Sequence, residues 1–143
     1  MLVKEAMTGN AEYIHSGTLL VDAAKKMADL DCGFLPIGDS EQDKLQGVIT
    51  DRDIAIRGVA GGLDPKQASV GEIKTDKVLY CFEDDDVKDA AENMRDQQVY
   101  RLIVLNNKDE KKLCGVISLG DIVRQGQDEV ASNAAKGITS KAA

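Results

Sequence analysis

Two short stretches of the chain pair a hydroxyl side chain with an aspartate three residues later. Thr50 and Asp53 follow one apolar run, and Ser118 and Asp121 follow another. An ionised carboxylate can accept hydrogen bonds from both hydroxyls of a ribose, and a serine or threonine hydroxyl can donate or accept beside it. These four side chains are therefore the first candidates for a nucleotide-binding site.

Two arginines could meet the phosphates of the same ligand. Arg52 lies inside the first stretch, and Arg101 lies just before a later apolar run. A guanidinium presents a planar fork of donors to phosphate oxygens, and the N–H groups at the start of a helix also favour an anion. Gly120 stands at the position equivalent to Arg52, and Phe34 at the position equivalent to Arg101. The two candidate sites are therefore unequal, and the residues do not say which one is filled.

The same pattern also has a purely structural explanation. A hydroxyl residue at a helix N-cap and an acidic residue at the third helical position form a capping box. Aspartate is short for the return bond to the cap N–H, so we expect this box to be imperfect. The helix dipole disfavours Arg52 by about 0.3–1 kcal/mol unless an anion lies near it, and a phosphate, Asp51 or Asp53 would serve. Ligand binding and helix capping both remain open.

The chain repeats itself, and the repeat places both stretches alike. Thr75 lies 67 residues after Thr8, in a similar local sequence. Gly115 lies 68 residues after Gly47. The extra residue falls in a polar turn, where insertions are tolerated. A nearly constant shift indicates two copies of one supersecondary unit.

Each copy is predicted to be β-α-β-β-α. In the first copy we expect a strand at 11–15, a helix at 19–31 capped by Thr18, strands at 34–37 and 45–50, and a helix at 51–59. Two strands joined by a short turn favour an antiparallel hairpin, whereas the first strand must return through a helix. The predicted fold class is α/β (α+β), with two β-α-β-β-α repeats paired about a pseudo-twofold axis. Both strand-to-helix junctions would then face a shared cleft.

The repeats divide the chain into three segments. Residues 1–62 form the first repeat with the start of a linker, residues 63–125 form the second, and residues 126–143 form a small polar tail. We expect the tail to be partly helical or disordered. Gly47 and Gly115, one in each repeat, are expected to allow close packing of the backbone.

Composition narrows the class of function. The net charge is -7 with pI ≈ 4.7, so the chain lacks the basic surface typical of nucleic-acid binding. No apolar run approaches the roughly 20 residues that span a bilayer. We interpret Cys32, Cys81 and Cys114 as small apolar core residues of a cytoplasmic protein. His15 is the only histidine, and the sequence offers no metal-binding cluster and no activated nucleophile, so we expect no catalytic residues, no metal site and no enzyme activity.

The repeated motifs resemble those of tandem CBS domains, a pair of which is also called a Bateman module. The stretch Thr50–Ile54, followed by Gly61–Pro65, is most similar to small stand-alone bacterial members, including those grouped with hypoxic response proteins. The resemblance covers about residues 1–125.

The resemblance implies a non-catalytic sensor, for energy sensing or other signal transduction, that binds an adenosine-containing ligand. The ligand would be AMP, ADP or ATP, or in some members NAD or S-adenosylmethionine, and no cofactor is required. Asp53 and Asp121 would hold the ribose, Thr50 and Ser118 would contact ribose or phosphate, and Arg101 matches an arginine position of the family. A homodimer packed through helices and a regulated protein partner are also implied. The alternative is a ligand-free structural or protein-interaction module.

Overall fold

The computed structural model describes residues 1–143 except 10, 12, 40–43 and 141–143. It contains two compact units. Unit 1 comprises Met1–Ala11 and Leu79–Ala143, and unit 2 comprises Glu12–Val78. Each unit therefore holds the body of one repeat together with the opening segment of the other repeat.

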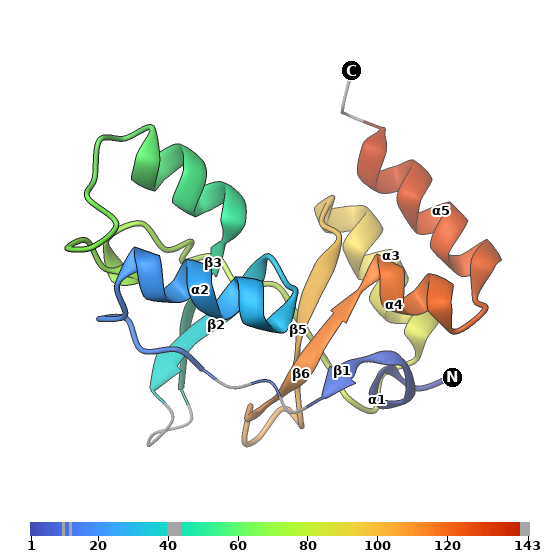
Figure 1. The fold of residues 1–143 in the computed structure, drawn as a ribbon. Coiled ribbons are helices and arrows are strands. Elements are labelled where there is room, and N and C mark those ends of the chain that lie inside the picture. The colour runs from blue at the N-terminus through green and yellow to red at the C-terminus, as the bar shows by residue number, and fades with distance from the viewer. Residues whose placement is uncertain (10, 12, 40–43, 141–143) are drawn as a thin grey trace. The chain divides into compact units, whose positions relative to one another are not determined.

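A four-stranded sheet forms the centre of unit 1 (Figure 1). Its strand order is β1 (Thr8–Gly9), β6 (Leu113–Ser118), β5 (Arg101–Leu105) and β4 (Tyr80–Phe82). β5 and β6 form the predicted antiparallel hairpin, and β4 pairs with β5 in parallel. The chain returns from β4 to β5 through α3 (Val87–Gln97), and β6 leads directly into α4 (Leu119–Arg124). The predicted β-α-β-β-α order is confirmed in this unit.

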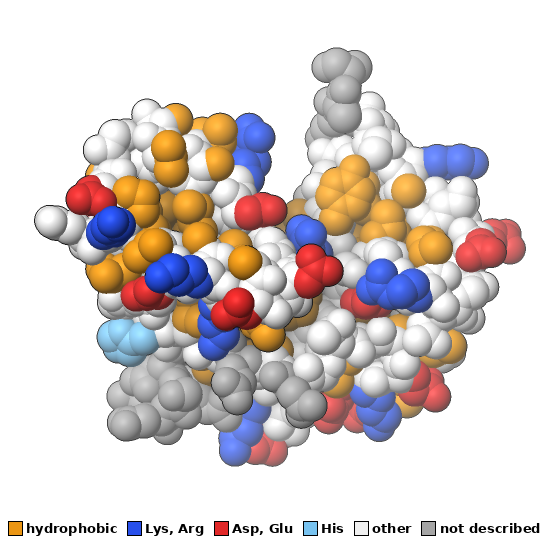
Figure 2. Space-filling view, viewed as in Figure 1, with side chains coloured by type: hydrophobic (Ala, Val, Ile, Leu, Met, Phe, Trp, Pro, Cys, Tyr) orange, Lys and Arg blue, Asp and Glu red, His pale blue; other side chains and the backbone are white. Residues whose placement is uncertain are grey.

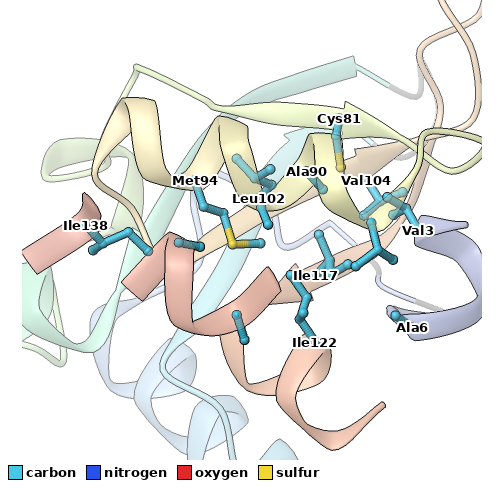
Figure 3. Packing of buried hydrophobic residues seen from close by; sticks show 14 residues of the cluster. Val3, Ala6, Cys81, Ala90, Met94, Leu102, Val104, Ile117, Ile122 and Ile138 are labelled. Carbon is cyan, nitrogen blue, oxygen red and sulfur yellow. The ribbon is translucent and has the colours of Figure 1, made fainter. Parts of the chain in front are cut away.

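The core of unit 1 is closed by the C-terminal helix α5 (Asp128–Thr139), which packs against α3 and α4. Ala131, Ala134 and Ile138 form a buried apolar stripe at helical spacing on α5. Figure 3 shows Ile138 in the same cluster as Met94 of α3 and Ile122 of α4. Of the two alternatives for the tail, helix or disorder, the structure shows a helix as far as Thr139, because this stripe has a core to pack against.

The first residues of the chain are part of unit 1. The short helix α1 (Val3–Ala6) buries Val3 and Ala6 in the core, where both are labelled in Figure 3. The backbone N–H of Val3 donates to the carbonyl oxygen of Asp85 at 2.8 Å, and Lys4 Nζ lies 2.7 Å from a carboxylate oxygen of Asp84. The hydrogen bond and negative charge of Asp84 raise the pKa of Lys4. Asp84 and Asp85, which follow β4, thus hold the N-terminal segment in place.

Unit 2 has the same plan with a smaller sheet. It contains α2 (Leu20–Leu30), the antiparallel pair β2 (Phe34–Asp39) and β3 (Lys44–Thr50), the π-helix η1 (Asp53–Val59) and the short 3-10 helix η2 (Val70–Glu72). The predicted strand at 11–15 includes residue 12, which lies outside the described residues, and Ile14 forms a single parallel bridge to Ile37. Thr18 is not the cap of α2: the N-cap is Leu19, one residue later, without a side-chain hydrogen bond.

The helices of unit 2 leave several large apolar side chains in solvent. Leu30 of α2 is 57% exposed, and Ile56 and Val59 of η1 are 51% and 61% exposed. Figure 2 shows hydrophobic side chains at the surface above these helices. Leu20, Ile37 and Ile49 are fully buried and form the centre of the unit's own core.

The opening segment of each repeat crosses the last strand of the other repeat at an equivalent point. β1 pairs with β6 at Thr8 in unit 1, and Thr75 exchanges both backbone hydrogen bonds with Val48 in unit 2, at 3.0 and 2.8 Å. A β-carbon on Gly47 would lie only 2.8 Å from the carbonyl oxygen of Thr75, and one on Gly115 would lie even closer to that of Thr8. The close packing predicted for the two glycines is confirmed.

Candidate functional site

The first candidate site lies where β3 ends and the following helix begins. The hydroxyl of Thr50 accepts a hydrogen bond from the backbone N–H of Asp53 at 3.0 Å, and Oδ2 of Asp53 accepts one from the backbone N–H of Thr50 at 3.0 Å. The capping box is therefore complete. The prediction that aspartate is too short for the return bond is wrong, because the turn brings the backbone N–H of Thr50 within reach of the shorter side chain.

Asp53 has two further partners, both outside the predicted motif. The Thr75 hydroxyl donates to Oδ2 of Asp53 at 3.3 Å, and Nη2 of Arg57 lies 3.5 Å from Oδ1. Arg57 also donates to the carbonyl oxygen of Ile73, and Nη2 lies 3.5 Å from the Thr75 hydroxyl. The Asp53 side chain is 16% exposed. This carboxylate therefore joins the end of β3 to the crossing segment around Thr75.

The second candidate site repeats the box between β6 and α4. The Ser118 hydroxyl accepts from the backbone N–H of Asp121 at 3.1 Å, and Oδ2 of Asp121 accepts from the backbone N–H of Ser118 at 2.9 Å. Arg124 donates to Oδ1 of Asp121. The Asp121 side chain is 8% exposed, which makes this residue the buried charged group among those the structure describes. Burying a charged group is costly unless it is paired and hydrogen-bonded, and Asp121 has both kinds of partner.

Gly120 explains one difference between the two motifs. A β-carbon at this position would lie 3.3 Å from Nη1 of Arg124 and 3.5 Å from the Ser118 hydroxyl. The glycine therefore leaves space for the guanidinium to fold back over Asp121. The first motif has Arg52 at this position, and there the aspartate takes its partner from Arg57, four residues later.

Arg101 lies beside the second site, which is where a residue that contacts the phosphates of the ligand would have to lie. It is the residue directly opposite Ser118 in the β5–β6 ladder, and it is exposed. Phe34 stands opposite Thr50 in the β2–β3 ladder. The cross-strand neighbour of the hydroxyl residue is therefore a cation in unit 1 and an aromatic ring in unit 2.

Arg52 is exposed, and in the described part of the chain its side chain has no ion pair. Asp51 accepts a hydrogen bond from the backbone N–H of Arg52 at 2.8 Å, and Asp53 pairs with Arg57 instead. Neither aspartate therefore neutralises the Arg52 guanidinium. It stays available to an anion from solvent.

Three residues of these sites were missed by the sequence analysis: Arg57, Arg124 and Thr75. The two arginines could have been predicted from the sequence, because they follow Asp53 and Asp121 by four and three residues, the spacings at which side chains of one helix meet. The role of Thr75 was harder to predict, since its equivalence to Thr8 indicates a shared backbone position but no side-chain partner.

Other reactive groups do not form a site in the described regions. No group of three or more His, Cys, Asp or Glu residues there is arranged to hold a metal ion. Burial and the nearby Asp85 raise the pKa of Cys81 to about 12, which keeps this thiol protonated. Cys32 is exposed, so its interpretation as a core residue is wrong. Helix α2 ends at Leu30, and Asp31 caps it in a left-handed conformation, so Cys32 lies in the turn after the helix and outside the core.

A groove of about 310 Å³ lies between α3 and α5. Lys88 and Arg95 line it on α3, and Glu129 and Asn133 line it on α5. Its lining includes two cations, Lys88 and Arg95, and two carboxylates, Glu92 and Glu129, and none of its lining residues belongs to the two candidate sites. None of the helices in the described ranges is long and apolar enough to cross a bilayer.

The fold and the repeated junctions define a tandem pair of small α/β repeats. The model of the CBS domain family matches residues 3–58 and 70–128. The chain therefore belongs to the CBS domain family and carries two copies of the domain. The resemblance stated from the sequence and the predicted α/β fold class with two repeats are both confirmed.

Known relatives agree with this assignment. Hypoxic response protein 1 of Mycobacterium tuberculosis is 35% identical over 122 residues, which make up 85% of this chain and 82% of that protein. A crystal structure of Hypoxic Response Protein I with two coordinated zinc ions is 33% identical with a TM-score of 0.73, covering 87% of this chain and 98% of that one.

A third relative is the CBS domain pair of protein MJ0100, solved in complex with 5′-methylthioadenosine and S-adenosyl-L-methionine. It is 28% identical with a TM-score of 0.76, and the match covers 90% of this chain and 98% of that one.

Proposed function

We propose that this chain is a non-catalytic regulatory module that binds an adenosine-containing ligand. One observation carries the proposal: both strand-to-helix junctions hold an ionisable aspartate beside a hydroxyl residue and within reach of arginine. The complex of the related MJ0100 pair with 5′-methylthioadenosine and S-adenosyl-L-methionine supports this ligand class, since both compounds contain adenosine.

Each group has a role in this proposal that follows from its chemistry. Asp53 and Asp121 accept hydrogen bonds from ribose hydroxyls through lone pairs that the capping box leaves open. Thr50 and Ser118 contact ribose or phosphate. The exposed guanidinium groups of Arg52 and Arg101 meet the phosphates of AMP, ADP or ATP, or those of NAD.

A thermal-shift screen with AMP, ADP, ATP, NAD, S-adenosylmethionine and 5′-methylthioadenosine tests the proposal. A ligand present at 100 times its dissociation constant stabilises the folded state by about 2.7 kcal/mol. For a chain of this size the midpoint should rise by about 5–10 °C. Adenine-free ribose 5-phosphate at the same concentration is the control. If none of the six compounds raises the midpoint, the proposal is wrong.

The second candidate function is a structural or protein-interaction module without ligand. The complete capping boxes favour it, because each aspartate already has a backbone partner and an arginine. The variants Asp53→Ala and Asp121→Ala separate the two functions. Loss of a cap alone costs about 1 kcal/mol of stability and leaves ligand affinity unchanged. A ribose role predicts that affinity falls as well.

The output of the module is also part of the proposal. We expect a homodimer in the cytoplasm that changes its contact with a regulated protein when the ligand binds. Light scattering with and without ligand measures the dimer. A monomer under both conditions would remove the homodimer from the proposal and leave ligand binding intact.

A further inference from the structure

We infer that the junction of unit 1, at Ser118 and Asp121, holds the ribose of the ligand more tightly than the junction of unit 2, and that the Thr75 hydroxyl sets this difference. The inference rests on the proposed function and deepens it, because it ranks the two sites and assigns a positioning residue. Thr75 acts on the ligand through Asp53, whose acceptor capacity it occupies.

The two carboxylates differ in how much of their capacity is free. A carboxylate offers about four lone-pair positions. Among the described residues, Asp53 uses three of them, for Thr50 N–H, the Thr75 hydroxyl and Arg57. Asp121 uses two in the same part of the structure, for Ser118 N–H and Arg124. A ribose diol donates two hydrogen bonds, so only Asp121 can accept both without losing a protein partner.

Arg57 and Arg124 also differ in how many partners hold them. Arg57 is held at three points, by Asp53, the carbonyl oxygen of Ile73 and the Thr75 hydroxyl, and its side chain is 47% exposed. Arg124 is 69% exposed, and within the described ranges its side chain bonds only to Asp121. Arg124 is therefore held at one point only in these ranges, and its exposed guanidinium can meet an incoming phosphate while it stays beside Asp121.

The strand opposite each hydroxyl residue points to the same ranking. Arg101 stands across from Ser118, whereas Phe34 stands across from Thr50. A ligand at the unit 1 junction therefore has two exposed guanidinium groups within the same local structure, from Arg101 and Arg124. At the unit 2 junction, Arg52 is the guanidinium that has no ion pair among the described residues, since Arg57 is engaged by the crossing segment.

The chain supplies a matched control for Thr75. Thr8 is its equivalent in the other repeat, 67 residues earlier, and pairs with β6 through its backbone just as Thr75 pairs with Val48. Its side chain is exposed and, in the described part of the chain, makes no hydrogen bond to Asp121. Thr75→Val and Thr8→Val remove the same hydroxyl from equivalent backbone positions, and only the first frees a lone pair of an aspartate.

The test is calorimetric titration of the full chain with each of the six adenosine compounds named above, all of which carry a free ribose diol. Asp121→Asn should weaken the tightest binding by about 10- to 100-fold, and Asp53→Asn should change it by less than about twofold. Asparagine keeps an oxygen that accepts the cap N–H, so both variants should fold. In the Asp121→Asn background, Thr75→Val should strengthen the remaining binding by about 2- to 10-fold, and Thr8→Val should leave it unchanged.

The outcomes separate the inference from the proposed function. If no compound binds the unmodified chain, the proposed function is wrong and the ranking falls with it. If tight binding is lost in Asp53→Asn and kept in Asp121→Asn, or is insensitive to both changes, the ranking alone is wrong. If Thr75→Val weakens binding or has no effect, Thr75 is not the positioning residue. Thr75→Ala repeats that test if the valine variant does not fold.

Discussion

The two strand-to-helix junctions have the same cap and different surroundings. In both, a hydroxyl and an aspartate exchange backbone hydrogen bonds at 2.9–3.1 Å. In unit 2, Asp53 is also tied to the crossing segment through Thr75 and Arg57. In unit 1, Asp121 is tied only to its own helix, through Arg124, as far as the described residues show.

The helices after the two caps differ as well. The helix after Asp53 continues as a π-helix and leaves Ile56 and Val59 in solvent, whereas α4 is an α-helix that α5 covers. π-Helical geometry is rare in proteins, so this helix differs from α4 in its backbone as well as in its neighbours. The two repeats therefore share their local hydrogen bonds, while the neighbours that each copy meets decide its burial, its charge balance and its room for a ligand.

The largest difference in stability between the junctions should appear when the apolar residue after each aspartate is truncated. Ile122 is fully buried in the core of unit 1, and its equivalent Ile54 is only partly buried against the core of unit 2. Ile122→Ala should lower the free energy of unfolding by about 3–5 kcal/mol, and Ile54→Ala by about 1–2 kcal/mol, because the cavity cost scales with burial. Urea denaturation measures both. Equal losses would show that α5 does not add to the burial of α4.

The next test concerns a feature that the two repeats share. Gly47→Ala and Gly115→Ala each place a β-carbon against a threonine carbonyl of the crossing segment, with less room at Gly115. Each should cost about 1–3 kcal/mol, with the larger loss at Gly115, because a backbone neighbour cannot move aside as a flexible side chain can. Thermal melts give the size. Hydrogen exchange at Thr8 and Thr75 shows whether the crossing segment is the part displaced.

Most of the fold could be predicted from the sequence because its signals are local. Apolar periodicity places α2, α3 and the two hairpins, and the shift of 67–68 residues reveals the repeat. The weak predictions lie at element ends. The predicted cap Thr18 lies one residue before the true N-cap, Leu19. The helix of the tail could not be predicted with certainty from its own residues, because its apolar stripe is buried only through contacts with α3 and α4.

The candidate site was predicted less completely than the fold. Thr50, Asp53, Ser118 and Asp121 form the two boxes, and Arg101 stands across from Ser118. Arg57 follows from helix spacing and could have been found, but its bond to the Ile73 carbonyl could not. That contact depends on which segment crosses β3, and crossing partners are tertiary information that no local pattern contains. The reach of aspartate to the cap N–H was misjudged because it depends on the turn geometry.

The two caps should contribute equally to the stability of their units, which removes one explanation for any difference in ligand binding. Thr50→Val and Ser118→Ala each delete the hydroxyl that accepts a backbone N–H from the aspartate. Each should lower the free energy of unfolding by about 1 kcal/mol, the usual cost of losing an N-cap. Chemical denaturation measures the pair. A loss at one site only would mean that the boxes differ in strength despite their similar distances.

The smallest expected difference in stability is between variants of Arg57 and Arg124. Arg57→Met should cost about 1 kcal/mol, since its guanidinium bonds to a carbonyl and a carboxylate and holds the crossing segment. Arg124→Met should cost less, about 0.5 kcal/mol, because the Arg124 guanidinium is exposed and the buried Asp121 keeps its hydrogen bond from the backbone N–H of Ser118, and that loss should shrink as salt is added. Hydrogen exchange at the Thr75 amide gives a local measurement, and it should rise in Arg57→Met alone. Unchanged exchange there would mean that Arg57 does not hold the crossing segment. Thr75 would then be free to turn away from Asp53, and the two junctions would offer a ribose the same number of acceptors.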